Sequence, residues 1–221
     1  MSTEEAKVIH GKYANHEIAV HPHTLAYHRQ SRKELDIFAY YLVRTLAGTM
    51  DIMFGNRYGH RAIVLETIAA VPGMVGGFVN HFRSLRRISD DRGWIHTLLE
   101  EAENERMHLM VYSHIARPSM WDRILIMLAQ FTFSFVFFFI YIISDRTAHR
   151  IVGYFEEEAV HSYTKYLALI DGGIQTDIKA PDIAIRYWGL GDDATLRDVI
   201  IATRADEMHH RDVNHKLADS L

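Results

Sequence analysis

Two copies of the pattern Glu-x-x-His lie about a hundred residues apart, and each falls within a strongly helical stretch. The copies run from Glu105 to His108 and from Glu207 to His210. Two further helical stretches each carry a lone glutamate, Glu66 or Glu156, on an apolar stripe. Residues three or four apart share one face of a helix, so both members of each copy point the same way. Four carboxylates and two imidazoles on four helices therefore predict a buried metal-binding cluster inside a helical bundle.

A third copy of the pattern, Glu158 to His161, tests this interpretation. The helix predicted over 148–170 has an apolar stripe that includes Glu156 and Tyr163. Glu158 is two positions from Glu156, which is about 200° of rotation around a helix. The third copy is therefore predicted to lie on a polar face and to bind no metal.

Composition limits the kinds of site that the chain can build. The 221 residues include no cysteine, which excludes disulfides, thiolate zinc sites and iron–sulfur clusters. Any metal must be held by histidine, carboxylate or water. The formal charge is only −4 and no long basic run occurs, so the chain is not expected to bind nucleic acid.

Hydrophobic periodicity predicts an all-α chain with one helical domain over residues 34–221, preceded by an extended arm over residues 1–33. The expected helices cover about 34–54, 61–88, 94–116, 119–145 and 148–170, with another starting near 193. We interpret the five histidines of the arm as solvated: His10, His16, His21, His23 and His28. The acidic N-terminus resembles neither a secretory signal nor a transit peptide.

The segment from Ile124 to Ile143 contains no charged residue and is a transmembrane candidate by hydropathy. The helices before and after it, however, carry Glu105 and Glu156. If the three helices run antiparallel, these two glutamates come within roughly 5 Å of the same height, at a rise of 1.5 Å per residue. The apolar helix is therefore expected to lie along the bundle. Together with helix 34–54 it predicts a monotopic protein, bound to a single leaflet.

Carboxylates and imidazoles suit iron or manganese, and bridging carboxylates hold two ions about 3.5–4 Å apart. The ligand set thus predicts oxygen chemistry. Tyr163 lies on the same helix face as Glu156 and is either a redox-active phenol or a core tyrosine. Asn104, His149 and Asp206 are positioned to hydrogen-bond ligands from outside the cluster.

Four sequence strings extend the interpretation: Leu65–Gly77, Leu99–Leu109, Glu156–Ala159 and Arg204–His215. In this order, over about residues 51–217, they resemble the alternative oxidase family. Soluble ferritin-like and reductase families share the ligands but not these strings. The resemblance implies a ferritin-like four-helix di-iron bundle with two additional apolar membrane-binding helices.

The implied activity is that of a cyanide-insensitive ubiquinol oxidase, which oxidises two quinols and reduces O₂ to two waters without pumping protons. Two iron ions are the implied cofactor, and Tyr163 is the implied redox-active residue. The implied metal ligands are Glu66, Glu105, His108, Glu156, Glu207 and His210.

Further roles follow from the resemblance alone. The implied quinol-binding residues are Arg61, Leu65, Phe155, Glu158, Ala159 and Ser162. The implied hydrogen-bond network around the metals contains Asn104, Tyr141, His149, Tyr187, Trp188 and Asp206. The family is a homodimer, and His81 matches an interface position.

The chain departs from the family pattern at three positions near the site. Phe155 stands where leucine is common, Ser162 where threonine is common, and Met208 where alanine is usual. No regulatory N-terminal cysteine or plastid-type insertion occurs. We therefore expect a bacterial member at the cytoplasmic face of the inner membrane, or the matrix face of the mitochondrial inner membrane if the source is eukaryotic. The alternatives are a di-iron hydroxylase or desaturase acting on lipid, and a metal-storing bundle without turnover.

Overall fold

The computed structural model describes residues 25, 27–31, 33–55 and 57–221, and for Leu125 only the backbone. Most of the predicted arm, with His10, His16, His21 and His23, lies outside the described residues. His28 lies within them and is not simply solvated, because its Nδ1 is 2.6 Å from a carboxylate oxygen of Glu157. Burying much of Glu157 against this imidazole gives the arm a point of attachment to the bundle.

The described part of the chain is all-α, as predicted, apart from an isolated bridge between Lys179 and Thr195. Its helices are α2 (Glu34–Phe54), α3 (Tyr58–Arg87), α4 (Trp94–Ala116), α5 (Met120–Ile143), α6 (Asp145–Asp171), α7 (Asp182–Trp188) and α8 (Leu196–Ser220).

Three helix starts and one short helix differ from the prediction, and the start of α8 is Leu196 rather than near 193. Helix α6 begins at Asp145 because the Ser144 side chain caps it, accepting a 3.1 Å hydrogen bond from the Thr147 backbone N–H. Helix α3 begins three residues earlier than expected, at Tyr58. Helix α7 was missed, although Pro181 precedes it and the left-handed Gly189 ends it.

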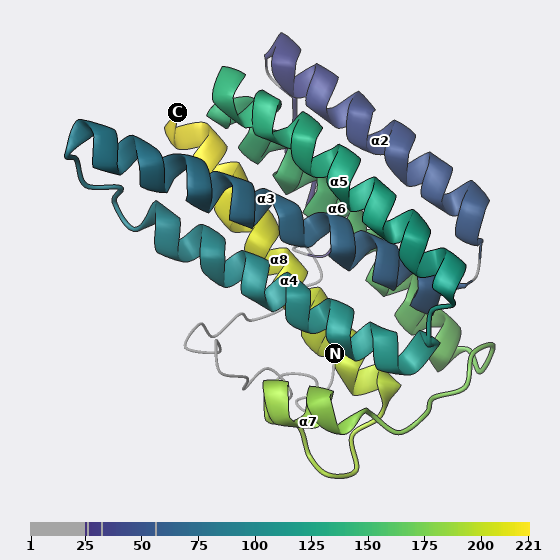
Figure 1. Cartoon of the computed structure of the whole chain (residues 1–221). Coiled ribbons are helices and arrows are strands. Elements are labelled where there is room, and N and C mark those ends of the chain that lie inside the picture. The colour runs from purple at the N-terminus through teal and green to yellow at the C-terminus, as the bar shows by residue number, and fades with distance from the viewer. Residues whose placement is uncertain (1–24, 26, 32, 56) are drawn as a thin grey trace.

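Four helices form the bundle, with α3 packed on α4 and α6 packed on α8 (Figure 1). Successive long helices run antiparallel across the molecule (Figure 1). Helices α3 and α4 approach so closely at Gly73 that a Cβ there would collide with the Leu98 carbonyl oxygen. This close approach brings the ligand-bearing faces of the two helices together.

Helices α2 and α5 lie outside the bundle, with α5 against α3 and α6 and α2 mainly against α6 (Figure 1). By length and composition α3 and α5 could each cross a membrane, but about half of the apolar part of α3 is buried inside the bundle. As predicted, α5 lies along the bundle. Its outer side exposes large apolar side chains, including Phe131, Phe135 and Phe139, and α2 exposes Phe38 and Tyr41.

Candidate metal centre

The six side chains predicted as metal ligands meet in the middle of the bundle. Helix α3 supplies Glu66, α4 supplies Glu105 and His108, α6 supplies Glu156, and α8 supplies Glu207 and His210. Each of these residues is at most 5% exposed. Long glutamate side chains reach the axis because their positions lie on the apolar stripes that pack the bundle.

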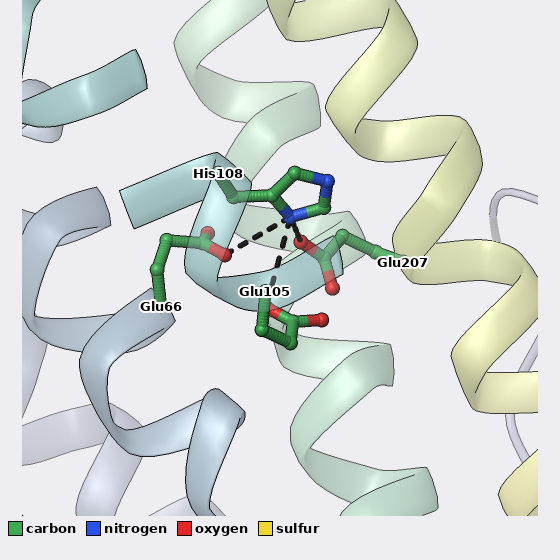
Figure 2. A group of neighbouring side chains, drawn as sticks. All are labelled: Glu66, Glu105, His108 and Glu207. Atoms are coloured by element: carbon green, nitrogen blue, oxygen red, sulfur yellow. Dashed lines mark hydrogen bonds and ion pairs between the residues drawn. The ribbon is translucent and has the colours of Figure 1, made fainter. Parts of the chain in front are cut away.

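The cluster consists of two overlapping groups whose ligand atoms lie within 4.8 Å of one another. Glu66 and His108 belong to one group, and Glu156 and His210 belong to the other. Glu105 and Glu207 belong to both groups. Figure 2 shows Glu66, Glu105 and Glu207 converging on the His108 ring. The geometry is that of two adjacent ion sites with two carboxylates shared between them.

The contacts of His108 with the ligand carboxylates are all made by one of its two nitrogens. Its Nδ1 lies 3.1 Å from a Glu66 oxygen, 3.2 Å from a Glu207 oxygen and 3.6 Å from a Glu105 oxygen. In the second group, His210 Nδ1 lies 2.6 Å from a Glu105 oxygen. Both imidazoles therefore present Nδ1 to the cluster.

The ligand atoms fit a metal better than they fit one another. Among the described residues, neither oxygen of Glu105 or Glu207 has a hydrogen bond of normal geometry, and neither does His210 Nδ1. Buried polar atoms without partners cost free energy, and buried carboxylates cost more. Their shared orientation toward one point is the arrangement expected of oxygen and nitrogen ligands to divalent ions.

The charges of the cluster support the same conclusion. Burial and neighbouring carboxylates raise the pKa of Glu105 and of Glu156 well above the usual value. Burial and the nearby Glu105 raise the pKa of Glu207 to about 8. The pKa of Glu66 is lowered despite its burial, because it faces His108. Without cations the cluster therefore has to retain protons, whereas two divalent ions would balance four carboxylates.

Four residues predicted around the metals gather behind His108. Its Nε2 lies 3.0 Å from Asp206 Oδ2, which also accepts hydrogen bonds from Asn104 Nδ2 at 3.0 Å and Trp188 Nε1 at 2.9 Å. Asn104 also donates to the Tyr187 hydroxyl at 2.7 Å. A carboxylate on the outer nitrogen fixes the ring orientation and makes the inner nitrogen a better ligand.

Tyr141 and His149 belong to a second chain of hydrogen bonds. The Tyr141 hydroxyl is 2.9 Å from His149 Nε2, and His149 Nδ1 is 2.9 Å from Asn214 Oδ1. Asn214 then donates to Glu101 Oε2 at 3.0 Å. Asn214 and Glu101 were not predicted as site residues. Each lies one turn from a ligand on the same helix face, at i+4 from His210 and i−4 from Glu105, which is the signal that would have found them.

Tyr163 projects from α6 into the cluster and is buried. Its hydroxyl donates a hydrogen bond to Glu66, and its ring stacks on Tyr112 with centroids 5.5 Å apart. Burial and the nearby Glu66 carboxylate raise the pKa of Tyr163 well above its usual value. The phenol is therefore neutral and hydrogen-bonded to a predicted metal ligand.

A cavity of about 500 Å³ connects the cluster with the apolar helices α2 and α5. Glu66, Glu156 and Glu207 lie at its inner end. Five of the six predicted quinol-binding residues line it: Arg61, Leu65, Phe155, Glu158 and Ala159. The sixth, Ser162, is buried on α6 but does not line the cavity.

Apart from the three glutamates at its inner end, the cavity is lined by two charged residues, and both are paired with α2. Arg61 bonds Asp51, and Glu158 bonds Arg44. The third Glu-x-x-His is outside the metal cluster, as predicted, because Glu158 faces this cavity and His161 is exposed.

His81 is exposed on the second half of α3, beside an apolar stripe. Met74, Phe78, Phe82 and Leu85 form this stripe, and each is more than two-fifths exposed. Among the described residues, exposed apolar side chains therefore occur on α3 as well as on α2 and α5.

Comparison with known proteins gives a consistent result. The family model described as "Alternative oxidase" matches residues 17–219. The chain is 55% identical over 192 residues to the mitochondrial ubiquinol oxidase of Mangifera indica, covering 87% of this chain and 60% of that protein. It is 53% identical over 195 residues to ubiquinol oxidase 2 of Nicotiana tabacum, covering 88% and 66%. It is 54% identical over 184 residues to ubiquinol oxidase 1c of Arabidopsis thaliana, covering 83% and 56%.

The chain therefore spans about three-fifths of the length of these relatives. The matched region contains the whole bundle, from α2 to α8, and all the ligands described above. A family model that covers nearly the full chain, together with the ligand cluster, assigns the family: this protein belongs to the alternative oxidases.

Proposed function

We propose that the protein is a ubiquinol oxidase, which oxidises two quinols and reduces O₂ to two waters without moving protons across the membrane. The observation that carries the proposal is the cavity between the apolar flank and the carboxylate cluster. A quinol dissolved in a bilayer reaches the cluster by this route without passing through water. The names of the relatives support ubiquinol as the substrate.

The proposed cofactor is a pair of iron ions held by Glu66, Glu105, His108, Glu156, Glu207 and His210. When bound, the irons would supply the site at which O₂ is reduced and the capacity to store electrons in pairs. Glu105 and Glu207 are the proposed bridges, because each belongs to both ligand groups. The fit is supported by the oxygens of Glu105 and Glu207, which have no hydrogen bond of normal geometry among the described residues.

The residues of the cavity would orient the quinol headgroup. Arg61 and Glu158 are the charged groups of its wall outside the metal cluster, next to the apolar Leu65, Phe155 and Ala159. Charged partners beside an otherwise apolar lining can bond the two polar ends of a quinol ring, which fixes its position. Ser162, on the same helix but outside the lining, is proposed to act by packing.

Tyr163 is proposed as the redox-active residue. Its hydroxyl donates to Glu66, so the phenol proton can move to that carboxylate when the ring loses an electron. Coupling the two transfers avoids a charged phenol in a buried, low-dielectric site. The surrounding bundle keeps the ring 2% exposed, which protects it from reaction with solvent.

We further propose that the protein lies in one leaflet and forms a homodimer. The exposed apolar sides of α2 and α5 supply the membrane-binding surface, next to the mouth of the cavity. The stripe of Met74, Phe78, Phe82 and Leu85 on α3, near His81, supplies the dimer surface, because a large exposed apolar patch usually marks an interface.

The test is oxygen uptake by purified protein with a short-chain quinol, in the presence of cyanide, alongside iron analysis. Tyr163→Phe is expected to abolish uptake while iron stays bound. Tyr112→Phe is the matched control, because it removes a neighbouring buried hydroxyl that bonds Thr203 and not a predicted metal ligand. Iron binding without any quinol-driven uptake in the wild type would instead favour a lipid hydroxylase or a metal-storing bundle.

A further inference from the structure

Two stacks of aromatic rings leave the metal cluster in different directions. In one, Tyr163 stacks on Tyr112, with centroids 5.5 Å apart and the rings tilted by 25°. In the other, Trp188 stacks on the ligand His108, with centroids 5.6 Å apart and a tilt of 26°. Tyr187 extends the second stack by an edge contact, with its centroid 5.1 Å from that of Trp188 and the two rings at 73°.

The two stacks end in different surroundings. Tyr112 is fully buried, and its hydroxyl donates to Thr203 at 3.2 Å, so the first stack ends inside the core. Trp188 is 4% exposed, but Tyr187 is only half-buried at the end of α7. The second stack therefore connects a predicted metal ligand with the surface.

Indole and phenol side chains can each lose one electron, and this chain has no cysteine to do so. Electron transfer weakens steeply with distance, so rings in contact pass electrons far faster than isolated ones. We infer that Trp188 and Tyr187 form a route by which a water-soluble one-electron donor reduces the metal centre when no quinol occupies the cavity. This inference rests on the proposed oxidase function, which supplies O₂ as the oxidant.

The hydrogen bonds of the stack suit this role. Trp188 Nε1 donates to Asp206 Oδ2 at 2.9 Å. A carboxylate at this distance stabilises positive charge on an oxidised indole. In the other stack, Tyr163 bonds the Glu66 carboxylate, but Tyr112 bonds the neutral hydroxyl of Thr203, which stabilises positive charge less well. An oxidising equivalent on that side stays near the cavity, where quinol can use it.

Each use of the route, here called a passage, transfers one electron from the protein surface to the metal centre. The Trp188 indole gives one electron to the centre and becomes a radical cation that keeps its Nε1 proton. Tyr187 then gives one electron to the indole and releases its phenol proton to water. A donor of the ascorbate class returns one electron to Tyr187, and water returns the proton. Four passages supply the electrons that reduce one O₂ to two waters, with four protons taken from water. The route would spare the protein from oxidation when quinol is scarce.

The experiment exposes iron-loaded protein to O₂ without quinol, in the presence of a nitroso spin trap, and locates the adducts by peptide mass spectrometry. The expected result is an adduct at Tyr187, lost on addition of ascorbate. Tyr41 is the internal control, because it is 64% exposed but distant from the stack, and it should carry no adduct. Equal labelling of Tyr41 and Tyr187 would show that the trap reports exposure and would overturn the inference.

Two variants sharpen the result. Trp188→Phe should remove the adduct from Tyr187 although the tyrosine is still present, provided that iron analysis shows a loaded centre. Tyr187→Phe should reduce the number of turnovers completed before inactivation and remove the protection given by ascorbate, while Tyr41→Phe should change neither. An unchanged lifetime and unchanged ascorbate protection in Tyr187→Phe would overturn the route.

Quinol-driven oxygen uptake is measured on the same preparations. Quinol-driven oxygen uptake without an adduct at Tyr187 would reject the route through Trp188 and Tyr187 but not the proposed oxidase function. Absence of uptake in the wild type rejects the proposed oxidase function, whatever the adducts show.

Discussion

The two Glu-x-x-His copies have the same spacing but hold their histidines differently. On α4, the outer nitrogen of His108 is bonded to Asp206, which Asn104 and Trp188 hold in turn. On α8, no hydrogen bond to the outer nitrogen of His210 occurs among the described residues. Asn214 instead bonds the His210 backbone carbonyl at 3.0 Å.

The surroundings of the two rings differ in charge as well. Asp206 and three ligand carboxylates raise the pKa of His108 well above its usual value, against the effect of burial. Burial lowers the pKa of His210, although Glu101 lies nearby. An identical sequence motif thus produces one imidazole that is fixed at both nitrogens and one that is fixed at one. Since the outer hydrogen bond tunes a metal ligand, the His108 site should bind its ion more tightly.

The largest effect is expected from Glu207→Ala, which removes a ligand common to both groups. Both ions should be lost, because each site keeps too few ligands and Glu105 is then the one remaining carboxylate of the two that both groups share. Metal content after gel filtration measures the loss. Glu103→Ala is the control, since its side chain is 62% exposed and pairs with the exposed Arg106. Retention of two ions by the Glu207 variant would show that Glu207 is not shared.

An intermediate effect is expected from Asp206→Asn. Removing the charge behind His108 should weaken the ion at that site by about 10–100-fold, the range typical of such outer partners. The His210 site should change less, which chelator competition on the two ions resolves. Asp212→Asn, at a residue 61% exposed on the same helix, is the matched control. Equal weakening of the two sites would contradict the asymmetry.

The smallest effect on metal content is expected from Glu101→Gln, because Glu101 belongs to neither ligand group. Its effect should appear instead in the pH dependence of stability of the metal-free protein. Burial raises the pKa of Glu101 from 4.5 to about 7, which corresponds to about 3 kcal/mol at roughly 1.4 kcal/mol per pKa unit.

The sign follows from proton binding. Between pH 4.5 and about 7 the folded protein holds the Glu101 proton more tightly than the unfolded chain does, so stability falls as pH rises through this range. The glutamine variant cannot titrate at this position, so its stability should fall less between pH 4.5 and about 7. It should therefore be more stable than the wild type at pH 8. Chemical denaturation at pH 5 and pH 8 measures the difference, with Glu103→Gln as control. An unchanged pH dependence would show that Glu101 is not buried as an acid.

Helical period explains why much of the site was predictable. Glu105 and His108 share a face because they are three residues apart, and the apolar residues around them show that this face is internal. The same reasoning correctly kept Glu158 out of the metal cluster, but it wrongly predicted a polar face, because Glu158 lines the mostly apolar cavity. Helix α7 was missed because seven residues are too few to show a period.

The amino-acid sequence by itself determined the all-α class, the six inward-facing ligand positions and the limits that a chain without cysteine sets on its metal chemistry, because these depend on local periodicity and composition. Only the tertiary structure decided that Glu105 and Glu207 belong to both ligand groups and that the cavity is lined by α2 and α5. It also decided that Asp206 lies behind His108, whereas no carboxylate among the described residues bonds the outer nitrogen of His210. Those features depend on how helices distant in the chain pack together, and periodicity within one helix carries no information about the axial offset or rotation of its neighbours.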